Sequence, residues 1–319
     1  MNRIAILDDY QNTARDCADW DSIPGSPEIV AFREHMPDEA AVAEAIANFD
    51  IVVVMRERTP FPESLMARLP RLQLLVTTGM RNLAIDMQAA RARGVTVCGT
   101  ALVPHAAFEH AWALILALVK RIPSEDRVMR EGGWQGGVST GLHGRTLGVL
   151  GLGKLGAQAA RVAHAFGMRV IAWSQNLSDE QAAAHGAERV DKNSFFRESD
   201  IITIHLVLSD RTRALVGKHE LALMKPTAML INTSRGPIVD EAALIEALRA
   251  GSIAGAGLDV FDTEPLPADH ALRTLANTVL TGHTGYVMQE NYVLSYSQAV
   301  EDIKAWLDGS PIRVLNEVS

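Results

Sequence analysis

A glycine-rich segment, Gly-Leu-Gly-Lys-Leu-Gly at 151–156, limits the folds open to this chain more than any other feature. It follows an apolar run, 147–150, and it precedes residues 157–166, which contain no glycine or proline and are predicted to be helical. A Gly-x-Gly-x-x-Gly motif alone is weak support for any function. Between a strand and a helix, however, it is typical of a dinucleotide-binding fold, and we predict NAD(P) as the cofactor.

Each glycine of this segment has a separate physical role. Gly151 permits the tight turn, Gly153 lets the backbone approach a pyrophosphate, and Gly156 lets the helix pack closely on the strand. The backbone of Lys154 and Leu155 should contact the cofactor at the helix N-terminus. The alternative is an ordinary glycine-rich turn that binds no nucleotide.

The residues that follow the next strand, 169–173, do not decide whether the coenzyme is NAD or NADP. An acidic residue about 20 positions after the glycines normally binds the ribose hydroxyls. Here Ser174 and Gln175 occupy that place, and no carboxylate would repel a 2′-phosphate. No arginine follows until Arg189, so the positive charge of a strict NADP site is also missing. We therefore expect both coenzymes to be used.

Short apolar runs alternate with helical or loop segments along the whole chain, which indicates an α/β protein with two doubly wound parallel sheets. The first series of strands is predicted at 4–7, 29–32, 51–54, 72–76 and 95–98, with helices at 38–48 and 86–93. The second series is predicted at 147–150, 170–173, 201–206, 228–232, 256–260 and 278–281. The last helix, 289–307, could return to pack on the first unit.

Composition excludes several classes of protein. The 319 residues carry 30 basic and 38 acidic side chains, a net charge of −8, without a basic cluster for nucleic acid or an anionic membrane. Cys17 and Cys98 are too few for a disulfide framework, and the cysteines and histidines lack metal-ligand spacing, so no metal is expected. The longest apolar stretch, 111–119, is too short for a membrane span, and no signal peptide is evident. We expect a cytoplasmic enzyme.

Three polar residues each follow a predicted strand of the second series: Arg235, Glu264 and His283. Because the carboxyl ends of parallel strands meet at one edge of a sheet, these side chains should converge. A base, its carboxylate and an anion anchor are a set suited to dehydrogenase chemistry. Taken singly, each could be an ordinary loop residue.

Three longer segments, at 142–156, 223–240 and 257–266, resemble the D-2-hydroxyacid dehydrogenase family, which includes phosphoglycerate dehydrogenases and glyoxylate/hydroxypyruvate reductases. The resemblance implies a Rossmann cofactor domain, 101–284, inserted in a flavodoxin-like substrate domain, 1–100 and 285–319. It implies hydride transfer between NAD(P)H and a small 2-oxo or D-2-hydroxy acid, with the active site between the domains. The same fold also resembles NAD(H)-sensing corepressors with little turnover, so a dinucleotide-sensing binding protein is the alternative.

By this resemblance, His283 is the acid/base, Glu264 orients it and favours the protonated ring, and Arg235 holds the substrate carboxylate and keto oxygen. Asp259, Thr233 and Ser234 would line the nicotinamide pocket. Candidate substrate-binding residues come from two loops of the first unit: Arg56, Thr78, Gly79, Met80 and Arg81. The physiological substrate, the reaction direction and the arginine that reads the substrate's distal group are not determined.

The predicted helix 106–121 is apolar nearly all round and must be buried on several sides. The family resemblance implies a homodimer through this helix, whereas burial within the chain is the alternative.

Substitution of Ser174 tests the expected use of both coenzymes. Ser174→Asp would repel a 2′-phosphate and would offer acceptors to the ribose hydroxyls, so we expect kcat/KM to shift toward NADH by about 1 to 3 kcal/mol. The measurement is the ratio of kcat/KM for NADH and NADPH before and after substitution. A strictly NADH-dependent wild type, or an unchanged ratio, would contradict this interpretation of Ser174.

Overall fold

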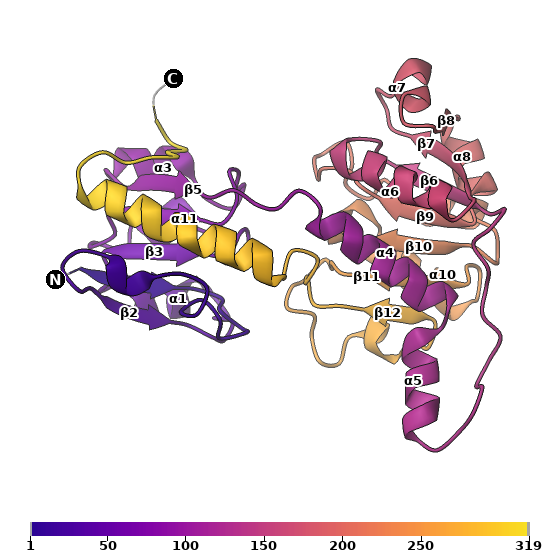
Figure 1. Cartoon of the computed structure of the whole chain (residues 1–319), viewed down its shortest axis with the longest axis horizontal. Helices are drawn as coiled ribbons and strands as arrows, with labels where there is room; N and C mark the ends of the chain where they lie inside the picture. The colour runs from indigo at the N-terminus through magenta and orange to yellow at the C-terminus, as the bar shows by residue number, and fades with distance from the viewer. Residues whose placement is uncertain (1, 318–319) are drawn as a thin grey trace. The chain divides into compact units, whose positions relative to one another are not determined.

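The computed structural model describes residues 2–317 and divides into two compact units (Figure 1). Unit 1 comprises Met1–Val103 and Val287–Ser319, and unit 2 comprises Pro104–Tyr286. The sequence predicts the changes of unit after 100 and 284, three and two residues earlier. Each unit contains one parallel sheet with helices on both faces, so the predicted α/β fold class is confirmed.

The sheet of unit 1 has five parallel strands in the spatial order β2-β1-β3-β4-β5, which is the flavodoxin-like order. They are β1 (Arg3–Ile6), β2 (Glu28–Ala31), β3 (Ile51–Val54), β4 (Leu74–Thr77) and β5 (Thr96–Gly99). The helical elements before the unit's interruption are η1 (Trp20–Ser22), α1 (Glu39–Ile46), α2 (Glu63–Met66) and α3 (Met87–Ala92). Side chains of α1, α2 and α3 form one apolar core with the sheet.

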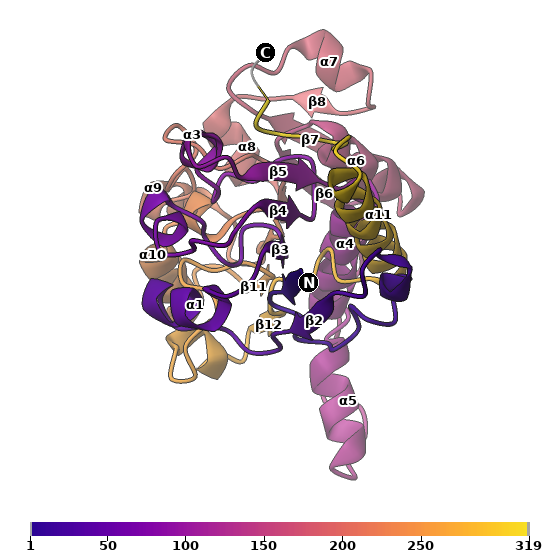
Figure 2. The ribbon, with the colours of Figure 1, turned by 90° about the vertical axis from the view of Figure 1, so that its left-hand side faces the viewer.

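The last helix, α11 (Gln289–Leu307), belongs to unit 1, as the sequence predicts. Figure 2 shows it on the opposite face of the unit 1 sheet from α1 and α3. Its polar side chains hold the segment by which the chain leaves the unit: Gln298 Oε1 accepts the Ala101 N–H at 2.7 Å, and Asn291 Oδ1 accepts the Val103 N–H at 3.0 Å. The chain that leaves unit 1 is thus fixed by the helix that returns to it.

Unit 2 has seven parallel strands in the order β12-β11-β10-β9-β6-β7-β8, a Rossmann order with one added strand. They are β6 (Thr146–Leu150), β7 (Arg169–Trp173), β8 (Glu188–Arg189), β9 (Ile201–Ile204), β10 (Met229–Asn232), β11 (Gly255–Leu258) and β12 (Thr278–Leu280). The sequence misses only β8, whose two residues are both exposed and give no apolar signal.

The helices of unit 2 cover both faces of its sheet. Helices α4 (Ala106–Val119), α6 (Lys154–Ala165) and α7 (Asp179–Ala183) share one apolar core with the strands, and α8 (Lys192–Glu198), α9 (Lys218–Leu223) and α10 (Glu241–Arg249) share the other. Two 3₁₀ turns, η2 (Gly236–Ile238) and η3 (Ala271–Thr274), follow β10 and β11.

Helices α1 and α3 lie within one or two residues of the predicted ranges, and two other helix boundaries differ more. Helix α6 begins at Lys154, not at 157, because Gly153 is its extended N-cap and the remaining residues of the glycine motif already form the first turn. The helix predicted at 106–121 ends at Val119, and a separate helix, α5 (Ile122–Arg130), follows it. Arg121, with φ of 57°, is left-handed and cannot continue α4, which separates the two helices.

Candidate active site

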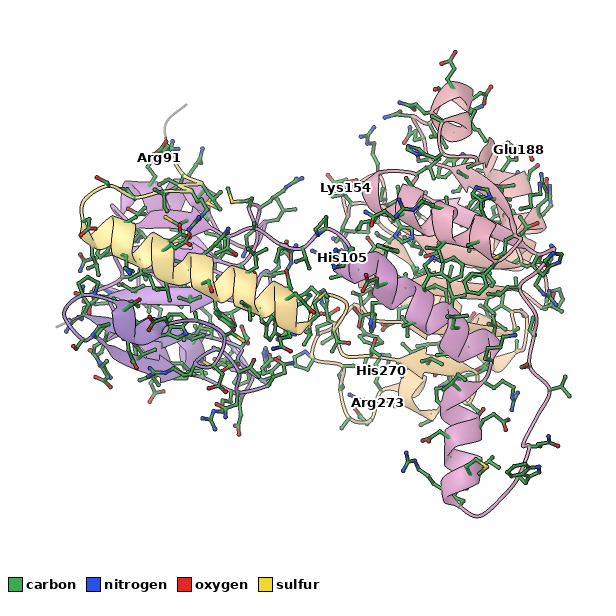
Figure 3. The ribbon with its side chains drawn as sticks, viewed as in Figure 1. Arg91, His105, Lys154, Glu188, His270 and Arg273 are labelled. Atoms are coloured by element: carbon green, nitrogen blue, oxygen red, sulfur yellow. The ribbon has the colours of Figure 1, made fainter. Side chains whose placement is uncertain are left out.

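The glycine motif forms a tight turn between β6 and α6, and Figure 3 labels Lys154 at the start of that helix. Gly151 has φ of 97°, and its N–H donates to the Trp173 carbonyl at 2.9 Å. A Cβ on Gly156 would lie 2.2 Å from the Gly151 carbonyl oxygen, so glycine is required there for close packing.

Gly153 differs from its neighbours, since a Cβ built on it would meet nothing within 4 Å. Open space therefore lies beside the backbone at the N-terminus of α6, where the first N–H groups of a helix lack intrahelical partners. An anionic group is stabilised at such a place by those N–H groups and by the helix dipole. The turn thus fits the pyrophosphate of a dinucleotide.

The loop after β10 carries Thr233, Ser234 and Arg235. Asn232, which is 1% exposed, fixes this loop: its side chain accepts from the Ser234 N–H at 3.0 Å and donates to the Arg235 carbonyl at 2.9 Å. The Ser234 hydroxyl donates to the Leu206 carbonyl, and Arg235 Nη1 donates to the Ser234 carbonyl at 2.7 Å. Arg235 is half-buried, and its position is held by the backbone around it.

Glu264 and His283 are in direct contact, although they follow different strands. Glu264 Oε2 lies 2.5 Å from His283 Nδ1, and its other oxygen accepts the Phe261 N–H at 2.9 Å. The two side chains are 32% and 21% exposed. Because Nδ1 is engaged by the carboxylate, Nε2 is the ring nitrogen left for another partner.

The loop that carries His283 is anchored to the carboxylate of Asp259, which is only 1% exposed. Oδ1 accepts from the Thr281 hydroxyl at 2.6 Å and from the Thr284 N–H at 2.7 Å, and Oδ2 accepts from the Gly285 N–H at 2.9 Å. The His283 N–H donates to the Asp259 carbonyl at 2.7 Å. Four hydrogen bonds to one residue therefore set where His283 stands.

His110 of α4 also contacts this network, with Nε2 at 3.2 Å from Asp259 Oδ1 and 2.8 Å from the Thr281 hydroxyl. Burial alone would raise the pKa of the Asp259 carboxyl, but the hydrogen bonds from His110 and Thr281 hold it below its ordinary value. From the sequence, His110 is predicted to be a structural or solvent-facing histidine. Its contact with Asp259, about 150 positions away, could not be predicted because no sequence spacing reveals it.

In unit 1, the loop after β4 already uses two of the amides expected to receive a substrate carboxylate. The Thr78 N–H donates to the Val54 carbonyl at 3.0 Å, and the Gly79 N–H donates to the Thr100 hydroxyl at 3.3 Å. Within residues 2–317, the amides of Met80 and Arg81 are the ones left for that task. The Arg56 guanidinium lies over Gly79: Nη1 would be 2.6 Å from a Cβ built there.

Residues 2–317 contain no cluster of three or more His, Cys, Asp or Glu that could hold a metal ion. Nor does any helix among them have the length and apolar character to span a membrane.

Comparison with known proteins places the chain among oxidoreductases. Residues 112–285 match the family described as D-isomer specific 2-hydroxyacid dehydrogenase, NAD binding domain. The glyoxylate reductase of Aeropyrum pernix is 40% identical over 256 residues, which cover 77% of this chain and 76% of that enzyme. The D-3-phosphoglycerate dehydrogenase of Synechocystis sp. is 36% identical over 281 residues, 86% of this chain but only 50% of that enzyme. The chain thus spans about half the length of such relatives.

Two solved structures show the same architecture over nearly the whole chain. The phosphoglycerate oxidoreductase of Vibrio cholerae O395 has a TM-score of 0.92 and 36% identity, and the match covers 97% of this chain and all of that one. A D-lactate dehydrogenase of Aquifex aeolicus, in complex with NAD and lactic acid, has a TM-score of 0.77 and 25% identity over 99% of this chain and 100% of its own.

The anchoring role of Asp259 is open to a stability measurement. Asp259→Asn turns one acceptor into a donor that faces backbone N–H groups, and we expect the free energy of unfolding to fall by about 1 to 3 kcal/mol in urea at pH 7. Asp262→Asn is the matched control on the same loop: burial and the nearby Glu241 raise the pKa of the Asp262 carboxyl, so its neutralisation should cost nothing. Equal losses in the two variants would rule out a special role for Asp259.

Proposed function

Since the chain belongs to the D-isomer specific 2-hydroxyacid dehydrogenase family, we propose that it acts mainly as a reductase of small 2-oxo acids, with His283 as the acid/base. It is an oxidoreductase that transfers a hydride between a nicotinamide coenzyme and a 2-oxo or 2-hydroxy acid. The observation that carries our assignment of roles is the contact between His283 and Glu264 on the dinucleotide-binding unit.

When NAD(P)H is bound, it supplies the hydride that reaches the carbonyl carbon of the substrate. The protonated His283 ring donates from Nε2 to the carbonyl oxygen, which becomes the hydroxyl of the product. The Glu264 carboxylate contacts Nδ1 and fixes the ring plane, so that Nε2 is the nitrogen that faces the substrate. In the oxidative direction, the neutral ring takes the same proton back.

Arg235 is proposed to hold the substrate by its carboxylate and keto oxygen. A planar guanidinium can donate to two oxygens at once, a task that lysine does poorly. The hydrogen bond of Nη1 to the Ser234 carbonyl limits the directions in which the rest of the guanidinium can point. Thr233 and Ser234 on the same loop, and Asp259 beneath the His283 loop, remain proposed contacts of the nicotinamide.

For the coenzyme phosphates, we propose the turn formed by Gly151, Gly153 and the first residues of α6. The open space beside Gly153 supports this proposal. For the substrate carboxylate, we propose the backbone at Met80 and Arg81, with the Arg56 guanidinium beside Gly79 as a neighbouring cation. We expect the choice of 2-oxo acid to depend on which distal group of the substrate the side chains of Arg56 and Arg81 can bind.

The sequence analysis expects a homodimer through helix 106–121, but we propose that the dimer interface is formed by the next helix, α5. Helix α4 already buries six of its side chains within unit 2, including Trp112 and Ile115. Helix α5 buries none, and it projects from the rest of unit 2 together with the loop that follows it (Figure 1). Four large apolar side chains are exposed along this arm, which comprises residues 122–138: Ile122 at 55%, Met129 at 53%, Trp134 at 74% and Val138 at 94%.

A second copy of the chain is the partner that we propose for this arm, since solvent-exposed clusters of large apolar side chains usually mark an interface.

A cytoplasmic location stays a prediction from the sparse cysteines.

Light scattering tests the dimer. At micromolar concentration the wild type should have twice the mass of one 34.6 kDa chain, and Ile122→Glu combined with Trp134→Glu should shift it toward the monomer. Leu83→Glu, at an apolar residue of unit 1 that is 66% exposed, is the control and should leave the mass unchanged. A monomeric wild type would refute the dimer.

Steady-state reduction of glyoxylate, hydroxypyruvate and larger 2-oxo acids with NADH and NADPH tests the function. His283→Ala should lower kcat by roughly 10²- to 10⁴-fold, the usual contribution of a general acid, with little change in coenzyme affinity. Glu264→Gln should also lower kcat with little change in coenzyme affinity, because the carboxylate that orients the ring is gone. Near-normal turnover of His283→Ala would exclude it as the acid, and coenzyme binding without turnover in the wild type would favour a dinucleotide-sensing protein.

A further inference from the structure

A cavity of ≈ 220 Å³ lies beyond the carboxyl end of β7, where the adenosine ribose of a dinucleotide is expected on a Rossmann sheet. Its wall joins the residues that follow β7 to the loop that follows β9. The lining residues are Trp173, Ser174, Gln175, Asn176, Leu206, Ser209, Arg211, Thr212 and Leu215. Residues far apart in the sequence therefore share one binding surface.

The lining offers hydrogen-bond donors but no negative charge. No aspartate or glutamate of the described residues lines this cavity or a second one, which shares Ser174 and Asn176 with it. A carboxylate at this place binds the ribose hydroxyls of NAD and repels the 2′-phosphate of NADP. A phosphate monoester carries a charge of about −1.5 to −2 at neutral pH and requires donors around its oxygens. The hydroxyls and amides of this surface suit it.

Arg211 supplies the positive charge that the residues after Ser174 lack. Among residues 2–317, it is the one arginine or lysine that lines the cavity, and it comes 37 positions after Ser174. Its side chain is exposed and forms no salt bridge with any carboxylate of residues 2–317. Its neighbour Asp210 does not line the cavity. The guanidinium is thus available to a ligand of opposite charge.

The backbone around Arg211 is held in a defined turn. The Thr212 hydroxyl accepts the Ser209 N–H at 2.8 Å, and the Arg213 N–H donates to the Ser209 carbonyl at 2.9 Å. The Ala214 N–H then donates to the Pro237 carbonyl at 2.8 Å, which fastens the end of the turn to the loop after β10. Because the backbone of this turn is already fixed, only the Arg211 side chain loses conformational entropy when it binds a ligand.

We propose that Arg211, together with the Ser174 hydroxyl and the Asn176 amide, binds the 2′-phosphate of NADP(H) and makes NADPH the preferred coenzyme. This rests on the proposed reductase function and narrows its coenzyme. It goes beyond the use of both coenzymes expected from the sequence, because the cation comes from a loop that only the fold brings to β7.

Calorimetric binding of two nucleotides to the full chain tests the proposal without any turnover. Adenosine 2′,5′-bisphosphate carries the 2′-phosphate and 5′-AMP lacks it. The wild type should bind the bisphosphate at least about tenfold more tightly, since charge-assisted hydrogen bonds to phosphate are strong. Arg211→Gln should remove most of that preference and leave 5′-AMP binding unchanged, which also shows that the variant is folded. Arg211→Lys should retain part of it.

Arg213→Gln is the matched control, because Arg213 lies on the same turn but does not line the cavity. It should keep the wild-type preference for the bisphosphate. Equal binding of both nucleotides by the wild type, or the same loss in Arg213→Gln as in Arg211→Gln, would overturn the proposal.

A parallel assay separates this inference from the function on which it rests. Reduction of glyoxylate or hydroxypyruvate with NADH, but no preference for the bisphosphate, would leave the reductase function standing and reject the role of Arg211. A preference for the bisphosphate without reduction of any 2-oxo acid by either coenzyme would do the reverse.

Discussion

The buried carboxylate of Asp259 is the interaction on which the geometry of the candidate site depends. It sits at the end of β11 and collects hydrogen bonds from the loop after β12 and from His110 on α4, so three elements of unit 2 meet at one charge. A buried carboxylate is stable only when such donors surround it. The same contacts fix the conformation of the loop that carries His283, and the His283 ring then contacts Glu264.

Strand order explains why residues from three loops can act together. Strands β10, β11 and β12 are neighbours in a parallel sheet, so the loops that carry Arg235, Glu264 and His283 leave it at one edge. Close approach of these loops needs small residues. A Cβ on Gly236 would lie 2.1 Å from the Phe261 carbonyl, so the glycine after Arg235 lets the loops of β10 and β11 pack together. Chemistry and packing thus depend on the same few positions.

Much of the fold could be predicted because the buried strands of a parallel sheet are continuous apolar runs. β3 and α11 begin and end where the pattern predicts, whereas β8 is too short and polar to be found. Helix ends were less predictable, since the start of α6 depends on the extended conformation of Gly153 and the end of α4 on the left-handed Arg121. Such backbone conformations are decided by local packing, which residue types reflect only weakly.

The sequence by itself determined the class of fold, the dinucleotide turn and the three candidate catalytic residues, because each is encoded in a local pattern: an apolar run, a glycine spacing, or a polar residue directly after a strand. Only the tertiary structure decided which partners these residues have. His110 contacts Asp259 from a distant helix, Arg211 lines the cavity beside Ser174, and the amides of Thr78 and Gly79 are already paired. These contacts join segments far apart in the chain, and a hydrogen bond or a charge acts through distance in space, on which sequence spacing carries no information.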